Sequence, residues 1–244
     1  MRDATATDPR AGQNVYSVIA VCGLDFEAAV AAGPSVVTLC GVGSERLAAR
    51  LEALLAQSEW GAQGSQRYCG IISFGTAGGL HPALQPGACV VADKIVTPDG
   101  SFAVDTGWLR ALLACLPNAR QGALAGVNQP LTDVTDKARL WQSSGALAVD
   151  MESHHAALIA QRHGLPFAAC RVVVDPAQRS LPSSATVGLR DDGTTAIMPI
   201  LRALAAHPGQ LPALIQLARD AGAAKQTLRQ VRAQLGVAFA MPSA

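Results

Sequence analysis

The sequence predicts an α/β protein in which helices cover both faces of a β-sheet and further helices form the C-terminal part. Short apolar runs rich in Val and Ile alternate with amphipathic stretches, as they do in sheets buried between two layers of helices. With 244 residues and no internal repeat, the chain fits one domain, which we place at 15–244. The polar residues 1–14 are expected to form a flexible tail.

Seven strands are expected, each a short run of mostly apolar residues of the length that buried strands have. Turn-forming residues or amphipathic stretches separate them. In chain order they are Tyr16–Cys22, Ser35–Cys40, Gly70–Phe74, Ala88–Val96, Ala123–Val127, Ala146–Val149 and Phe167–Val174.

Helices are expected where apolar residues recur at helical spacing. The first begins at Ser44, a residue type that favours helix N-caps, and carries Leu47, Leu51, Leu54 and Leu55 on one face. Gly or Pro bounds the other expected helices, which are Glu152–His163, Ala196–Ala206, Gln210–Ala221 and Ala224–Leu235.

The composition excludes several classes of protein. A net charge of +1 and 4% aromatic residues provide neither a basic surface for phosphates nor a stacking platform for bases, so no nucleic-acid partner is expected. No stretch reaches the roughly 18 uncharged apolar residues of a transmembrane helix, and no secretory signal begins the chain, so we expect a cytoplasmic protein. The six cysteines form no C-x-x-C pair, and no metal or organic cofactor is expected.

Ligands of α/β proteins gather at the carboxyl ends of strands, so the residues just past each strand are the candidates for chemistry. After the first strand, Asp25 and Glu27 begin a helix, and either they complement its dipole or they serve a site. After the second strand, Gly43 and Ser44 lead into a helix N-terminus, where free N–H groups either bind an anion or form a plain capped turn.

Two further segments follow later strands. Three glycines occur in the turn expected at Gly75–Gly79, and their density favours a close approach of a ligand to the main chain. The segment Asp150–Glu152 precedes a helix, and Asp175 ends the strand that follows it. The residues alone leave open whether Asp175 only forms the turn before Pro176.

In this order, the segments resemble the superfamily of purine nucleoside phosphorylases and methylthioadenosine/adenosylhomocysteine nucleosidases. The resemblance runs from about Val15 to Ala177 and rests on three motifs, which are Gly-Thr-Ala-Gly-Gly-Leu at 75–80, Val-Asp-Met-Glu-Ser at 149–153 and Arg-Val-Val-Val-Asp-Pro-Ala at 171–177. Met-Glu-Ser at 151–153, Gly-Leu at 23–24 followed by Glu-Ala at 27–28, and Lys137 look most like the hopanoid-associated phosphorylases. The resemblance implies a three-layer phosphorylase/hydrolase-like fold with a central mixed β-sheet flanked by helices.

The resemblance also implies roles for individual residues. Asp175 looks like the acid that protonates the imidazole nitrogen of the purine, and Glu152 looks like the carboxylate that holds the ribose hydroxyls. Proton delivery to the leaving base and stabilisation of a positively charged ribose are the chemistry that cleavage of this bond needs. Met151 would pack on the sugar or simply in the core. Thr76, Ala77 and Gly78 would line the ribose and base, and 127–132 would contact the purine edge through main-chain groups.

The resemblance leaves open whether phosphate or water accepts the ribosyl group. The better-known phosphorylases of the superfamily clamp phosphate with two arginines, but Leu24 to Ala28 offers none and Ser73 stands at the second position. Glu27 instead matches the nucleosidase glutamate that positions a water. A weaker anion site could still form from Gly43, Ser44 and Arg46, with inorganic phosphate as co-substrate.

The closer resemblance implies adenosylhopane as the substrate, an adenosine with a polycyclic lipid at its 5′ position, and adenine and ribosylhopane as products. The C-terminal helices would then form a lipid groove or a peripheral membrane contact, or only core and subunit packing. A homo-oligomer is expected, because superfamily members are dimers, trimers or hexamers. Two alternatives stay open, a methylthioadenosine/adenosylhomocysteine-type nucleosidase and a non-catalytic nucleoside-binding protein.

Overall fold

The computed structural model describes residues 16–41, 44–59, 67–181, 209 and 211–242. Within them, eight strands form one mixed sheet. The strands are β1 (Tyr16–Cys22), β2 (Val36–Cys40), β3 (Arg67–Gly79), β4 (Cys89–Thr97), β5 (Gly100–Ala103), β6 (Arg120–Gly126), β7 (Ala148–Asp150) and β8 (Phe167–Asp175). The tail expected at 1–14 lies outside the described residues.

Five of these strands close into a ring. β8 pairs in parallel with the length of β3 and antiparallel with β4, and β4 pairs with β6. The short β7 completes the ring because it pairs in parallel with β6 and antiparallel with the end of β3, at Gly78 and Gly79. β1 and β2 extend the sheet from β3, and β5 extends it from β4. The sheet is therefore an open layer at one end and a small barrel at the other.

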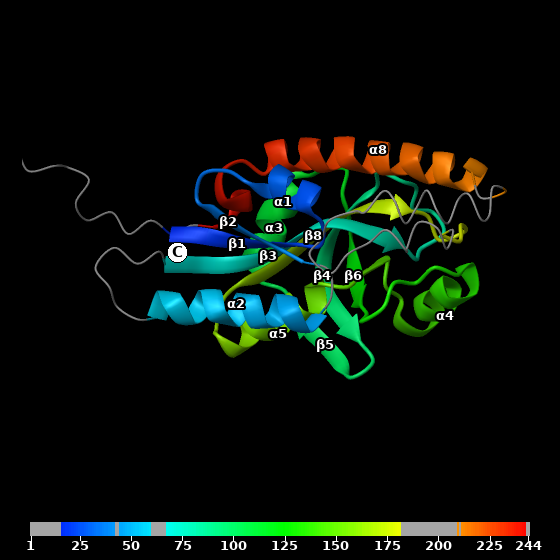
Figure 1. Cartoon of the computed structure of the whole chain (residues 1–244). Helices are drawn as coiled ribbons and strands as arrows, with labels where there is room; N and C mark the ends of the chain where they lie inside the picture. Colours follow the sequence, from blue (N-terminus) through cyan, green and yellow to red (C-terminus); the bar gives the residue numbers. More distant parts are fainter. Residues whose placement is uncertain (1–15, 42–43, 60–66, 182–208, 210, 243–244) are drawn as a thin grey trace, which may run out of the picture.

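Helices cover both faces of the sheet, as expected, and the C-terminal part is helical. They are α1 (Asp25–Ala31), α2 (Ser44–Glu59), α3 (Thr106–Cys115), α4 (Val134–Ser144), α5 (Ser153–Arg162) and α8 (Leu211–Gln234), followed by the 3₁₀ turn η2 (Val237–Ala240). Figure 1 shows α1, α3 and α8 above the strands and α2 and α5 below them. This arrangement confirms the predicted fold class.

Two buried clusters of apolar side chains fill the space between the layers. One packs α2 and α5 against the sheet around Leu47, Leu51 and Ile159, and the other packs α3, α8 and η2 around Trp108, with Leu228 among its members. The indole of Trp108 donates a hydrogen bond to the carbonyl oxygen of Phe239 at 2.8 Å, which joins η2 to α3. None of the described helices is long and apolar enough to cross a membrane.

Several predicted boundaries are wrong. β3 does not stop at Phe74 but continues to Gly79, so the glycine-rich segment is a strand and not a turn. The two helices expected at Gln210–Ala221 and Ala224–Leu235 are one helix, α8, because Gly222 lies inside it without breaking it. The strand β5 and the helices α3 and α4 were not predicted from the sequence. The helix expected at Ala196–Ala206 falls outside the described residues.

Candidate active site

A pocket lies where the carboxyl ends of β1, β3 and β8 meet β7 and the N-termini of α1 and α5. Four carboxyl groups line it, those of Glu27, Asp150, Glu152 and Asp175, and all four side chains are buried. Its other walls are main chain and apolar side chains, and the full lining is Gly23, Leu24, Glu27, Thr76, Ala77, Gly78, Val127, Pro130, Leu131, Val149, Asp150, Met151, Glu152, Val174, Asp175 and Leu181. Seven of these residues were predicted site residues, and the fold brings them into one cavity.

Glu27 sits in the first turn of α1 and turns its carboxylate inwards. One oxygen, Oε2, accepts hydrogen bonds from the N–H groups of Gly23 at 2.9 Å and Leu24 at 3.1 Å. The other, Oε1, accepts from the N–H of Thr76 at 2.8 Å and from its hydroxyl at 2.6 Å. Two donors at each oxygen fill the acceptor positions of the carboxylate. Glu27 thus both caps α1 and joins it to β3.

Gly75 allows this contact between α1 and β3. A Cβ atom at this position would lie 2.6 Å from Nη1 of Arg171 and 2.7 Å from Cδ of Glu27, closer than real Cβ atoms come to other atoms. The glycine-rich motif therefore serves a close approach, but the group that approaches is a buried carboxylate of the protein itself.

Arg171 of β8 is the centre of the acidic end of the pocket. Its side chain is fully buried, with Nε 2.7 Å from Oδ2 of Asp150 and Nη2 3.2 Å from Oε2 of Glu152. Nη2 also donates a hydrogen bond to the hydroxyl of Ser73 at 2.5 Å. Burial opposes the positive charge, but Asp150 and Glu152 outweigh it and hold the pKa of the guanidinium above its ordinary value. The arginine therefore stays charged.

Glu152 is the N-cap residue of α5, yet its side chain makes no capping hydrogen bond. Asp150 caps the helix instead, because its Oδ1 accepts a hydrogen bond from the N–H of Ser153 at 3.0 Å. The pKa of Glu152 is raised to about 8, mainly by burial; Arg171 acts against this rise, and Asp150 and Glu27 add to it. The Glu152 carboxyl is thus left for the pocket, next to Gly23, whose missing side chain makes room for it.

Asp175 ends β8 at the opposite side of the pocket and pairs with a lysine. Nζ of Lys137, on α4, lies 2.5 Å from Oδ2 of Asp175, and the lysine is completely buried. Burial raises the pKa of Asp175, and the ammonium group of Lys137 acts against that rise. Gly78 of the neighbouring strand leaves the carboxyl group open to the cavity, since a Cβ there would lie 3.5 Å from both oxygens of Asp175.

The remaining predicted residues fall into two groups. Thr76, Ala77, Gly78 and Met151 line the pocket, together with Val127, Pro130 and Leu131 of the segment expected to contact a base. Of the predicted anion site, Gly43 lies outside the described residues, Ser44 begins α2, and Arg46 is an exposed side chain of that helix that is not among the described residues of the pocket lining.

Three charged residues of the site were not predicted from the sequence as site residues. Arg171 and Asp150 stand inside the recognised motifs, but no periodicity shows that an arginine in an apolar strand points into a site. Lys137 was noted only for the resemblance, and it comes from a helix that was not predicted.

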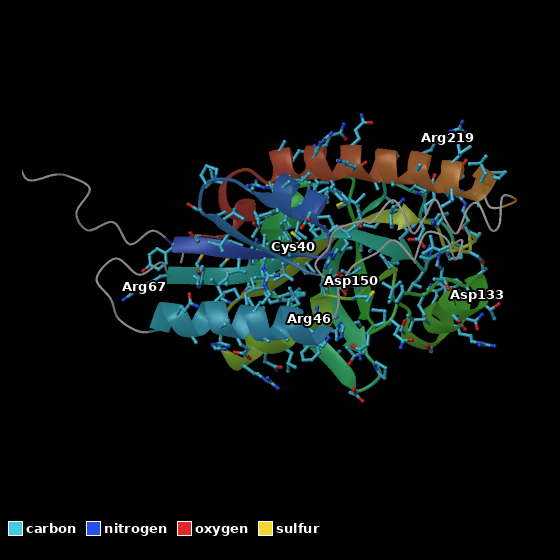
Figure 2. The ribbon with its side chains drawn as sticks, viewed as in Figure 1. Cys40, Arg46, Arg67, Asp133, Asp150 and Arg219 are labelled. Atoms are coloured by element: carbon cyan, nitrogen blue, oxygen red, sulfur yellow. The ribbon has the colours of Figure 1, made fainter. Side chains whose placement is uncertain are left out.

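Figure 2 shows Asp150 in the interior, whereas Arg219 points away from the outer side of α8. Among the described residues, no group of three or more His, Cys, Asp or Glu side chains could hold a metal ion.

Comparison with families of known proteins gives one match over most of the chain. The model of the family described as the phosphorylase superfamily matches residues 23–205, which include every charged residue of the pocket. A search of curated protein sequences found no significant match.

Solved structures of similar fold are nucleosidases and a related hydrolase. The 5′-methylthioadenosine/S-adenosylhomocysteine nucleosidase of Helicobacter pylori has a TM-score of 0.62 at 14% identity, covering 90% of this chain and 98% of that chain. The nucleosidase of the same name from Neisseria meningitidis has a TM-score of 0.59 at 17% identity, with 89% and 99% covered. Futalosine hydrolase of H. pylori has a TM-score of 0.60 at 13% identity, with 89% and 97% covered. At these identities the likeness shows the fold.

Proposed function

The chain belongs to the phosphorylase superfamily of enzymes, and we propose that it hydrolyses the N-glycosidic bond of a purine nucleoside, with water as the acceptor. The observation that supports water over phosphate is the charge of the pocket. Four carboxyl groups line the described part of the cavity, and no Lys, Arg or His among the described residues does so. Arg171 and Lys137 lie behind the carboxyl groups, fully buried and ion-paired. A phosphate dianion would find none of the paired cations that normally bind it among the described residues of the pocket lining.

Asp175 is the proposed proton donor to the leaving base. When the glycosidic bond breaks, its electron pair passes to the base, and a proton delivered to the ring nitrogen neutralises the developing negative charge. A carboxylic acid can deliver that proton only if it holds one near neutral pH, and burial raises the pKa of Asp175 in the required direction.

Glu152 is the proposed ribose ligand. The sugar becomes a positively charged oxocarbenium ion as the base leaves, and a carboxylate at the ribose hydroxyls stabilises that charge. The pKa of Glu152 in the empty pocket is about 8, and the positive charge that develops on the sugar favours its ionised form. The helix N-terminus leaves Glu152 free for this contact because Asp150 takes over the capping. Asp150 and Arg171 thus orient Glu152 without occupying both of its oxygens.

Glu27 is the proposed base that takes a proton from the attacking water. Its four acceptor positions are filled by three main-chain N–H groups and the hydroxyl of Thr76. The N–H groups are fixed by the backbone, but the hydroxyl hydrogen rotates freely. A water that binds beside Oε1 would replace the Thr76 hydroxyl as donor and leave the other three bonds intact. The carboxylate would then hold the water and accept its proton as the bond to the sugar forms.

The substrate is proposed to be an adenosine that carries a substituent on its 5′ position. Two candidates differ in that substituent. The motif resemblance favours adenosylhopane, and the apolar side chains of Pro130, Leu131 and Leu181 at the pocket are compatible with an apolar group. The solved nucleosidases of similar fold favour the small methylthio group of 5′-methylthioadenosine.

A substrate panel with and without phosphate tests the proposal. The purified chain is incubated with adenosine, inosine, 5′-methylthioadenosine and adenosylhopane, and the free base and the sugar product are quantified by mass spectrometry. We expect adenine and a free ribose derivative as products. In ¹⁸O-labelled water, the ribose derivative should carry one ¹⁸O atom at its anomeric carbon. A ribose 1-phosphate product would show that the reaction is phosphorolysis and not hydrolysis. Binding of a nucleoside without release of its base would contradict the enzymatic proposal.

A further inference from the structure

Lys137 is a lysine without access to solvent, in a helix in which no other side chain is fully buried. Throughout α4, which the structure describes completely, Lys137 is the one buried residue, and its exposed fraction is zero. Taking an ammonium group out of water costs several kcal/mol unless partners replace the water, and a leucine would fill the same space without that cost. The charge at this position therefore calls for an explanation beyond packing.

The partners of Lys137 match an ammonium group in number. Nζ lies 2.5 Å from Oδ2 of Asp175, 3.2 Å from the carbonyl oxygen of Pro176 and 2.9 Å from that of Arg179. An ammonium group has three hydrogens and donates one to each of these oxygens. The lysine uses Oδ2 of Asp175, so Oδ1 is the oxygen that can carry a proton for the base.

We propose that Lys137 is the positioning residue of the proton donor: it aims the Asp175 carboxyl group into the pocket and neutralises the carboxylate that remains after the proton has gone to the base. The inference rests on the proposed function, because it acts through Asp175. Lys137 itself touches neither the nucleoside nor the reacting bond.

The proposed step balances in protons and electrons. The bond between the anomeric carbon and the base breaks, its electron pair goes to the base, and the ring nitrogen takes the proton that Asp175 carries on Oδ1, while Lys137 keeps all three of its hydrogens. Asp175 becomes a carboxylate whose Oδ2 lies against the Lys137 ammonium, so the new negative charge is paired at once. Release of the base and uptake of one proton from solvent restore the starting state.

A purely structural role is the competing explanation. The bonds to the carbonyl oxygens of Pro176 and Arg179 hold the segment that follows β8, and this segment reaches the pocket at Leu181. Loss of such a tether would lower stability and raise KM. It would not change the pH at which the proton donor loses its proton, whereas loss of a neighbouring positive charge would.

The test combines kinetics with a titration that needs no turnover. With 5′-methylthioadenosine or the best substrate of the panel, Lys137→Met should lower kcat roughly tenfold to a hundredfold, less than loss of Asp175 itself. It should also move the basic limb of the kcat/KM profile to higher pH, since the opposing charge is gone. Lys137→Arg should keep the limb near its wild-type pH, and the exposed Lys94→Met serves as the matched control.

A double-mutant cycle separates action through Asp175 from an independent effect. In an Asp175→Asn background, Lys137→Met should change kcat by less than about twofold, because the group on which it acts is absent. A kcat loss of the same size in both backgrounds, or an unshifted pH profile, would overturn the proposal.

The carboxyl-carbon chemical shift of Asp175 supplies the second measurement. In ¹³C NMR titrations, the Asp175 signal should change at a higher pH in Lys137→Met than in the wild-type protein, because the opposing charge is gone, and near the wild-type pH in Lys137→Arg. Lys137→Gln replaces Lys137→Met if the latter does not fold, and an Asp175 signal that titrates at the same pH in all the proteins would overturn the proposal. If the chain releases no base from any nucleoside, the proposed function fails, and this titration still decides whether Lys137 acts on Asp175.

Discussion

At one end of the pocket a single carboxyl group, Asp175, meets a single lysine, whereas at the other end Glu27, Asp150 and Glu152 surround one arginine. The first end has matching charges, because it holds one carboxyl group for one cation. The second has more carboxyl groups than cations, and the pKa of Glu152 rises as a result of its burial and of that crowding. The difference indicates a division of labour between proton delivery to a base and stabilisation of a positively charged sugar.

The largest effect is expected at the end with matching charges. Asp175→Asn keeps the shape of the side chain but cannot deliver a proton, so kcat should fall by roughly 10²–10⁴-fold. The loss should be measured with a substrate of the panel by release of the base. Asp136→Asn, an exposed change on α4, is the control and should leave kcat unchanged. Full activity of Asp175→Asn would show that Asp175 does not deliver the proton to the base.

At the acidic end, loss of the arginine should cost stability. Arg171→Met leaves three buried carboxyl groups without their cation, and removal of one member of a buried ion pair typically costs about 3–5 kcal/mol. The free energy of unfolding should be measured by urea denaturation at pH 8, with the exposed Arg120→Met as control. The deficit should be smaller at pH 6, where Glu152 is protonated. An equal deficit at both pH values would mean that packing and not charge makes Arg171 important.

Glu152 should give the protein a pH-dependent stability of a definite sign. A carboxyl group whose pKa is raised by folding binds more protons in the folded state, so its contribution is full below the unfolded pKa and is lost as the pH rises to the folded pKa. The window runs from about 4.5 to about 8. Within it, wild type should lose stability relative to Glu152→Gln, with a slope of at most about 1.4 kcal/mol per pH unit.

Urea denaturation of the wild-type protein and of Glu152→Gln across that pH window measures this slope. Asp99→Asn, which changes an exposed carboxyl group, is the control. A wild-type protein that gains stability relative to Glu152→Gln as the pH rises would show that Arg171 outweighs burial at this site.

The smallest effect is expected from phosphate. Because no cation lines the described pocket, added phosphate should change the rate of base release by less than about twofold compared with sulfate at equal ionic strength. A rate that increases in proportion to phosphate would mean that a cation outside the described residues completes an anion site.

The sequence predicts the location of the site better than its internal partners. Glu27, Glu152, Asp175 and Thr76 were predicted because each follows or ends a strand within a recognisable motif, and the pocket brings all four together. Lys137 pairs with Asp175 across 38 residues, and Arg171 contacts Ser73 across 98 residues. Such partners depend on tertiary packing and leave no local pattern. The shift from a predicted turn to a strand at Gly75 has the same origin, since pairing with β8 overrides the low strand propensity of glycine.

The ring of five strands has a consequence for how the enzyme folds. Its closure depends on β7, three residues that join β6 to the end of β3. The strands that bear the site are far apart in the chain, and the entropy of bringing such distant segments together must be overcome before their contacts contribute. We therefore expect the pocket to form late in folding, after β1 and β2 have paired with β3. A bound nucleoside would slow hydrogen exchange most at β7 and the end of β3.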